Sequence, residues 1–306
     1  MKGASLSEQE KLESGDWLVS GRLIHLQGRL ACPFWGVMGI WAVLCGTFAS
    51  DHFAWEGRDL LTLAFVLILT DLAWGSLWEL ATGTDWFHPL AFGWPPKRPS
   101  SLTVLPYTQP GSPGGVIFRW LNRWVGWWRE CFWPELGSAF LGLIAAVLLT
   151  AVLTLLLPGR FRLLNAILVA LVGVGIVFRR QGRRWLAGGA WVQTGLGWMA
   201  GHSAFAEMDV VSLALALTFA GVIWGSLRTA QRLPGGLWLQ NGGQVIGVGL
   251  AVALKQPLAA GALGLCLLGQ VAVQPVLRLG GHADQVFRRT WPWLMAAMLI
   301  SAWAIS

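Results

Sequence analysis

The sequence predicts an all-α membrane protein whose chain crosses the bilayer about nine times in a single bundle. Of the 306 residues, 55% are hydrophobic and only 12% are charged, which is too little charge to cover a water-soluble surface. The apolar residues gather in runs that are long enough, as helices, to cross a bilayer core of about 30 Å. Short polar or basic loops separate these runs, so we expect an integral membrane protein.

The chain begins with a segment, residues 1–31, that is expected to be cytoplasmic and amphipathic. Its first 16 residues are polar, so no cleaved signal peptide is expected. Within the segment Arg22, His25 and Arg29 recur at spacings of three and four, which predicts an amphipathic helix at the membrane interface. One transmembrane domain, residues 32–306, follows. Its predicted spans are residues 32–49, 60–80, 136–157, 163–178, 185–201, 210–227, 240–254, 258–279 and 291–305.

The basic residues predict the orientation. If the N-terminus is cytoplasmic, all of the 22 lysines and arginines except Arg58, Arg160, Arg162 and Lys255 fall on the cytoplasmic side. We therefore expect a cytoplasmic N-terminus, an outer C-terminus and location in the cytoplasmic (inner) membrane of a bacterium. The net charge of +7 lies in short loops, so it indicates contacts with anionic lipids and not with nucleic acid.

The longest predicted loop, residues 81–135, is cytoplasmic and begins with a proline-rich stretch. Residues 118–133 are amphipathic and predict a helix that lies on the inner leaflet. Its role is open between a membrane anchor and a lid or docking surface for another membrane protein. One face carries Trp120, Trp124, Val125, Trp127, Trp128 and Phe132, and the other carries Arg119, Arg123, Arg129 and Glu130.

A four-residue phrase occurs twice, as residues 74–77 and 224–227, each reading Trp-Gly-Ser-Leu. Both copies are predicted to end an apolar helix at the cytoplasmic face, in the second and sixth spans. The offset of four spans implies a parallel repeat, in which spans one to four correspond to spans five to eight. Corresponding helix ends that meet at one membrane face are a place for a polar site.

Charged residues near these two helix ends are the first candidates for such a site. Asp71 lies in the second span, where an ionisable group costs about 2.5 to 3.5 kcal/mol and needs a partner or a role. Glu79 and Asp85 follow towards the cytoplasm. Arg228 and Arg232, four residues apart, occupy the corresponding end of the sixth span. For Asp71 the alternative is a hydrogen bond to a neighbouring helix; for the arginines, anion binding competes with an ordinary topological role.

Other polar residues are weaker candidates. His202, near Glu207 and Asp209, is either a capped or solvated histidine or an axial ligand to a chlorophyll or haem. Intramembrane amides suit hydrogen bonds between helices, with ligand binding as the alternative; they are Asn165, Gln193, Asn241, Gln244, Gln270 and Gln274. The four cysteines lack metal spacing, and neither a Ser-His-Asp order nor a phosphate-binding glycine loop is present. The 21 tryptophans suit membrane interfaces or the lining of an apolar pocket.

The topology, the repeated helix ends, the long second loop and the segment Arg29-Leu30-Ala31-Cys32-Pro33 resemble the UbiA-type intramembrane prenyltransferases. In that family, two acidic motifs after helices two and six hold Mg²⁺ on an isoprenyl diphosphate, so that an allylic cation forms and a hydroquinone or chlorophyllide attacks it. Asp71 and Glu79 match the ends of the first motif, but its middle acidic position is Gly75. The second region carries Arg228 and Arg232 and lacks acids.

The resemblance implies a diphosphate or lipid-headgroup site at Arg29, Arg228 and Arg232. It also implies a ligand cavity lined by Trp74, Trp78, Trp224, Asn241 and Gln244. Since the acids are largely lost, the chain is predicted to be a non-catalytic relative, an accessory or structural subunit of a membrane complex. The expected ligand is an isoprenoid lipid, quinone, carotenoid or chlorophyll-type pigment, and a photosynthetic complex is one setting.

The alternative is a divergent, Mg²⁺-dependent prenyltransferase that attaches an isoprenyl chain to an aromatic or tetrapyrrole acceptor. It would use Asp71, Glu79 and Asp85 with Arg228 and Arg232. A transporter is a third class, favoured only by Asp71, because the paired carboxylates expected of ion coupling are missing.

Overall fold

The computed structural model of the protein describes residues 35–88, 112–180, 185–275 and 283–306. Within these ranges the secondary structure is helical, as the sequence predicts. The predicted N-terminal segment 1–31, the motif at residues 29–33, and Arg29 with it, lie outside the described residues, as does most of the proline-rich stretch.

The predicted apolar runs overlap helices wherever the structure describes them, although runs 32–49 and 258–279 extend into residues outside that part. The elements, in chain order, are α2 (Trp35–Phe48), α3 (Gly57–Leu67), η2 (Ile68–Trp74), α4 (Gly75–Gly83), α6 (Pro113–Trp127), η3 (Trp128–Phe132), α7 (Trp133–Leu156), α8 (Phe161–Arg180), α9 (Leu186–Ala190), η4 (Trp191–Gly195), α10 (Leu196–Phe205), α11 (Val210–Ala230), α12 (Gly236–Ala253), α13 (Pro257–Val273) and α15 (Ala283–Ile305).

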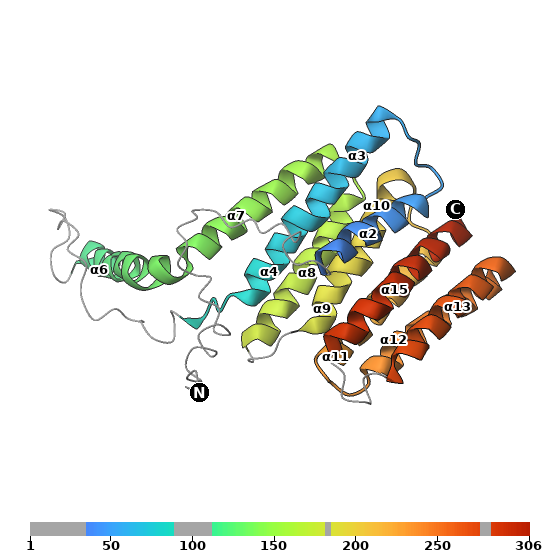
Figure 1. Ribbon diagram of the computed structural model, residues 1–306. Coiled ribbons are helices and arrows are strands. Elements are labelled where there is room, and N and C mark those ends of the chain that lie inside the picture. Colours follow the sequence, from blue (N-terminus) through green and yellow to red (C-terminus); the bar gives the residue numbers. More distant parts are fainter. Residues whose placement is uncertain (1–34, 89–111, 181–184, 276–282) are drawn as a thin grey trace, which may run out of the picture.

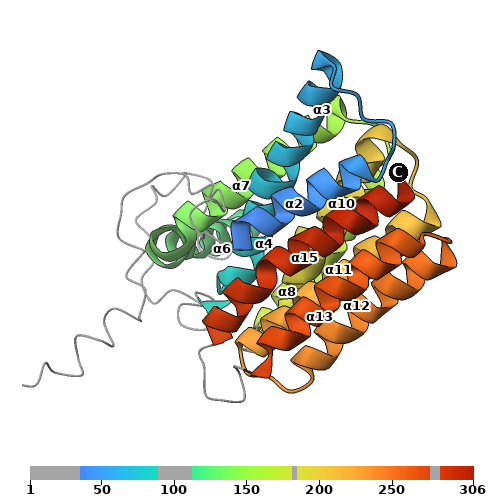
Figure 2. The same ribbon diagram turned by 45° about the vertical axis from the view of Figure 1, so that its right-hand side comes forward.

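The helices pack side by side in one elongated bundle and consecutive long helices run in opposite directions (Figures 1 and 2). We call the end that carries the C-terminus and the loops at 49–56, 157–160, 206–209 and 254–256 the upper end. The lower end carries residues 84–88 and 231–235. Short loops suffice for these reversals, since neighbours in sequence are neighbours in space.

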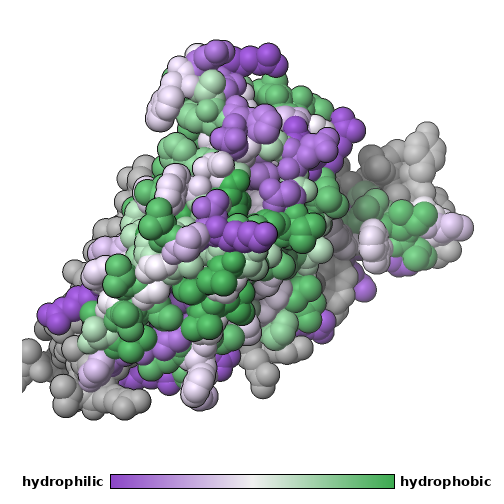
Figure 3. Space-filling model, turned by 90° about the vertical axis from the view of Figure 1, so that its right-hand side faces the viewer, coloured by the Kyte–Doolittle hydropathy of each residue, from purple (hydrophilic) through white to green (hydrophobic). Residues whose placement is uncertain are grey.

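Four helices among the described residues are long and apolar enough to cross a membrane: Gly57–Gly83, Pro113–Leu156, Phe161–Arg180 and Val210–Ala230. Large hydrophobic side chains remain exposed on several helices, as expected for surfaces that face lipid. On α12 and α13 the exposed set includes Val245, Ile246, Leu258, Leu265 and Leu268. Figure 3, which looks onto the right-hand side of the bundle in Figure 1, shows broad hydrophobic areas on this surface.

The amphipathic helix of the long loop is not separate from the third span. α6, η3 and α7 form one continuous helical stretch from Pro113 to Leu156, whereas the sequence predicted a loop up to residue 135. Ser112 caps the start of α6 by accepting a hydrogen bond from the Gly115 N–H at 3.0 Å. α6 extends beyond the bundle (Figure 1), and its exposed apolar side chains are Val116, Ile117, Trp120, Leu121 and Trp124.

The second long helix contains a π-helical segment, η2, between α3 and α4. The first Trp-Gly-Ser-Leu copy begins at its last residue, Trp74, and the helix then continues to Gly83. The prediction that both copies end a helix is therefore wrong for the first copy. The second copy lies one turn before the end of α11 at Ala230.

The buried apolar side chains form two main clusters. One joins α2, α11, α13 and α15 around Met38, Phe219, Leu263, Leu294 and Met298. The other joins the α3–η2–α4 stretch, α7, α8 and α10, with side chains that include Val66, Leu69, Trp74, Phe161 and Leu168. Because α2 and α10 contribute to both clusters, their contact holds the two halves of the bundle together.

α2 and α10 cross with their backbones in direct contact. A Cβ atom on Gly46 would overlap the Trp198 carbonyl oxygen, and one on Gly201 would overlap the Val43 carbonyl oxygen. Small residues permit such an approach between membrane helices, where packing replaces the hydrophobic effect. The Thr47 hydroxyl also donates a hydrogen bond of 3.5 Å to the Gly201 carbonyl oxygen.

Candidate functional site

The three predicted carboxylates occupy different environments in the lower half of the bundle. Asp71 is half-buried in η2, whereas Glu79 on α4 and Asp85 beyond it are exposed. The Asp85 carboxylate accepts a hydrogen bond from the Phe87 N–H at 3.2 Å. In the described part of the chain no three histidine, cysteine or acidic side chains lie close enough to hold a metal ion together. Asp71, Glu79 and Asp85 therefore do not form together the group of ligands that a shared Mg²⁺ would require.

The predicted anion-binding arginines lie where α11 turns into α12. The Arg228 guanidinium donates to the Pro234 carbonyl oxygen from Nε at 3.2 Å and from Nη2 at 2.7 Å. It also stands over the Trp224 ring, 5.8 Å from its centroid. Arg232 is exposed, with a positive φ of 55°. Through these two hydrogen bonds, Arg228 ties the end of α11 to the loop that leads into α12.

The predicted cavity residues belong to different parts of the core. Trp74 is fully buried in the second cluster, and its indole N–H donates to Asn165 Oδ1 at 2.8 Å. Trp78 lies in the same cluster, with its ring 6.0 Å from that of Trp185. Trp224 is half-buried against the first cluster. The structure therefore does not group Trp74 and Trp78 with Trp224.

The predicted amides join α12 to α13. Gln240 donates to Gln270 Oε1 at 3.3 Å. Asn241 and Gln274 exchange two hydrogen bonds, of 3.2 and 2.7 Å, between their amide groups. Gln244, one turn further along α12, is buried, and its Nε2 has no hydrogen-bond partner in the described residues. Most of the amides on these two helices thus form hydrogen bonds between α12 and α13.

The reciprocal pair can be tested by a double-mutant cycle. Asn241→Leu or Gln274→Leu alone leaves the other amide without its partner, so each is expected to lower the free energy of unfolding by about 1 to 2 kcal/mol. The double variant should recover part of this loss. Denaturation of the purified protein in detergent measures it, and additive losses would contradict the pairing.

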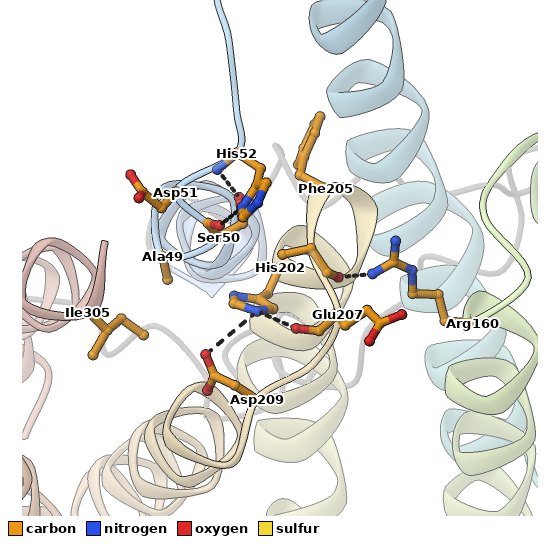
Figure 4. A pocket seen from close by; sticks show the side chains of 11 residues that line it. Ala49, Ser50, Asp51, His52, Arg160, His202, Phe205, Glu207, Asp209 and Ile305 are labelled. Carbon is orange, nitrogen blue, oxygen red and sulfur yellow. Dashed lines mark hydrogen bonds and ion pairs between the residues drawn. The ribbon is translucent and has the colours of Figure 1, made fainter.

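A polar pocket of about 560 Å³ lies at the upper end of the bundle (Figure 4). It is built where the ends of α2, α10 and α15 meet the starts of α8 and α11. Its lining comprises Ala49, Ser50, Asp51, His52, Arg160, His202, Phe205, Ala206, Glu207, Asp209 and Ile305. Two of the loops that form it follow from local sequence. Asp209 caps α11 by accepting a hydrogen bond from the Ser212 N–H at 2.5 Å, and Asp51, in the loop after α2, has a positive φ of 55°.

His202 is the least exposed residue of the lining, at 2%. Its Nε2 is 3.1 Å from the Glu207 carbonyl oxygen, which can only accept, so Nε2 carries the proton. The other nitrogen, Nδ1, is buried without a hydrogen-bond partner in the described residues. Figure 4 shows this side of the ring turned towards Ala49 and Ile305. Because the proton is on Nε2, where it bonds to the Glu207 carbonyl oxygen, Nδ1 remains available as a hydrogen-bond acceptor.

The charged groups of the pocket lie on its exposed rim. Asp209 Oδ2 is 4.0 Å from His202 Nε2, and Arg160 donates to the Ala206 carbonyl oxygen. His202 follows the predicted fifth span, which ends at residue 201. Burial lowers the pKa of its imidazole, outweighing the Glu207 carbonyl and the Asp209 carboxylate, which raise that pKa. Burial therefore favours the neutral form of the imidazole.

The sequence singles out His202 with Glu207 and Asp209, but not Asp51, His52 or Arg160. Asp51 and His52 share one loop and Arg160 lies in another, both distant from His202 in the sequence. The only signal among the three is Arg160, one of the few basic residues assigned to the outer side. The pocket's other face, with Ile305, comes from the C-terminal helix.

Comparison with protein-family models, curated proteins and solved structures gave no match to the chain.

Proposed function

We propose that the protein is a UbiA-like membrane protein without prenyltransferase chemistry, and that it acts as an accessory subunit of a larger membrane complex. We further propose nine spans with the N-terminus in the cytoplasm. The alternating directions of the helices support the nine spans (Figure 1), and the distribution of basic residues supports the orientation.

This proposal rests on the positions and contacts of the charged residues that would bind a diphosphate. Ionisation of a diphosphate needs positive charge concentrated on the leaving group, and carboxylates must hold any metal that supplies it. Arg228 donates to the Pro234 carbonyl oxygen. Asp71 is half-buried, whereas Glu79 and Asp85 are exposed, and the three carboxylates do not form a group that could hold a metal ion. This geometry suits a retained scaffold better than a retained catalyst.

Support for a partner subunit comes from α6. Its exposed Trp120 and Trp124 form part of an apolar face on a helix that extends beyond the bundle (Figure 1). Tryptophan is enriched among the residues that dominate protein interfaces. Arg119 and Arg123 on the same helix are also exposed, and anionic headgroups of the inner leaflet would attract them. A helix in this position would meet a membrane-embedded partner through its tryptophans.

The test is gentle detergent extraction from the native membrane, followed by size-exclusion chromatography with absorbance and mass spectrometry on one peak. We expect other membrane subunits to co-elute, together with an isoprenoid, quinone, carotenoid or chlorophyll-type molecule. The Trp120→Ala/Trp124→Ala variant should lose the subunits. Trp303→Ala, which removes an exposed tryptophan from α15, should keep them.

One outcome would contradict the proposal and support the alternative enzyme. A lone, colourless protein that releases diphosphate from an isoprenyl diphosphate in the presence of Mg²⁺, with the activity abolished by Asp71→Asn, would overturn the proposal. It would establish the divergent prenyltransferase instead.

A further inference from the structure

The pocket around His202 presents acceptors and few free donors. The Ser50 hydroxyl donates to the Thr47 carbonyl at 2.6 Å, and His52 Nδ1 is 2.5 Å from the Ser50 carbonyl, which fixes its proton there. His202 has committed its own N–H to the Glu207 carbonyl. The neutral imidazole of His202 therefore keeps one unprotonated nitrogen, Nδ1. A ligand for such a pocket must bring the donors.

The rim also carries more negative than positive charge. Asp51, Glu207 and Asp209 line the pocket together with a single guanidinium, that of Arg160. The histidines add no charge when neutral. A positively charged ligand is therefore favoured over a neutral or anionic one.

The buried Nδ1 of His202 is the observation that separates this pocket from an ordinary acidic surface. His202 is 98% buried and lines the pocket, and its Nδ1 lacks a partner in the described residues. A buried acceptor without a hydrogen bond is unfavourable. A donor that enters the pocket beside Ala49 and Ile305 can satisfy it (Figure 4).

Two other ligands fit less well. A bare metal ion needs several ligands at about 2.0 to 2.6 Å, and the lining side chains do not form such a group. A chlorophyll or haem bound through His202 would have to bring an apolar macrocycle against a rim of charged side chains.

We propose that the pocket of about 560 Å³ binds a primary ammonium group, which donates to His202 Nδ1 and is balanced by the Asp51 and Glu207 carboxylates. This chemistry has two sources, a free amine in solution or the ethanolamine headgroup of a lipid. Both can reach the pocket because it lies at an end of the bundle and has an exposed rim.

The first experiment compares ethanolamine with choline, which has the same charge but no N–H donor. Calorimetry on the full-length protein in detergent should show ethanolamine binding at least about tenfold tighter. Asp51→Asn and Glu207→Gln should each weaken ethanolamine binding about fivefold, since each removes one charge at an exposed site. Glu56→Gln, an exposed acid at the same end but outside the pocket, should leave it unchanged. His202→Phe should reduce the preference for ethanolamine over choline.

The second experiment separates the two sources. In nanodiscs, a higher unfolding temperature in phosphatidylethanolamine than in phosphatidylcholine, lost in Glu207→Gln, identifies the lipid headgroup. Calorimetric binding of ethanolamine without that lipid effect identifies a free amine. Equal binding of ethanolamine and choline, no effect of either Asp51→Asn or Glu207→Gln, or no response to ethanolamine and to phosphatidylethanolamine alike overturns the proposal. Co-elution with partner subunits is measured separately and does not depend on this pocket.

Discussion

Gly201→Val is expected to lower the free energy of unfolding by about 3 kcal/mol and to leave little folded protein after detergent extraction. Position 201 meets the Val43 carbonyl oxygen across the crossing of α2 and α10, so any side chain there forces two backbones apart. Because these helices contribute to both apolar clusters, the displacement affects the whole bundle. Thermal unfolding and size-exclusion chromatography of the purified variant measure the loss.

Gly249→Val is the matched control. Gly249 lies on α12, is exposed, and has open space where a Cβ atom would be placed. The same substitution there should change stability by less than about 0.5 kcal/mol. Equal losses at both positions would mean that the general cost of valine in a helix, and not the close crossing, decides the result.

Trp74→Ala is expected to cost about 3 to 5 kcal/mol, because it empties a fully buried position in the second cluster. Trp74→Phe should cost less, about 1 to 2 kcal/mol, since it mainly removes the hydrogen bond to Asn165 Oδ1. Trp224→Ala should cost about 1 kcal/mol, because Trp224 is only half-buried beneath Arg228. Denaturation in detergent, followed by tryptophan fluorescence, ranks the three variants.

The comparison of Trp74 with Trp224 tests the repeat directly. Two equivalent copies of Trp-Gly-Ser-Leu predict equal costs for the two alanine variants. Unequal costs in the expected order indicate that the phrase serves two different packing environments. Equal costs would contradict the packing described for Trp224 and restore the case for equivalent halves.

The positions of the helices could be predicted because they depend on local composition. An apolar run in a membrane must satisfy its own backbone hydrogen bonds, and a helix does so within the run itself. The predicted runs at residues 60–80, 163–178 and 210–227 accordingly fall within Gly57–Gly83, Phe161–Arg180 and Val210–Ala230. The boundary at residue 135 failed because a bent helix continues through η3, and the amphipathic pattern of α6 does not show whether it joins α7.

The different burial of the two Trp-Gly-Ser-Leu copies could not be predicted either, because burial is not a property of the local sequence. The residues read the same in both copies, but burial depends on neighbours that the local sequence does not contain. Trp74 meets Asn165 of α8, whereas Trp224 lies beneath the guanidinium of its own helix. The same side chain is thus fully enclosed in one copy and half-exposed in the other.

By itself the sequence determined the helical class and the apolar runs, because hydropathy and helical period are local properties, and it offered His202 only as one of the weaker candidates. Only the tertiary structure decided which polar groups meet. It brought Asp51 and Arg160 to His202 from separate loops, and it paired the Arg228 guanidinium with the Pro234 carbonyl. Such meetings depend on how helices cross, and the crossing of α2 and α10 is set by the backbone contact that Gly46 and Gly201 permit.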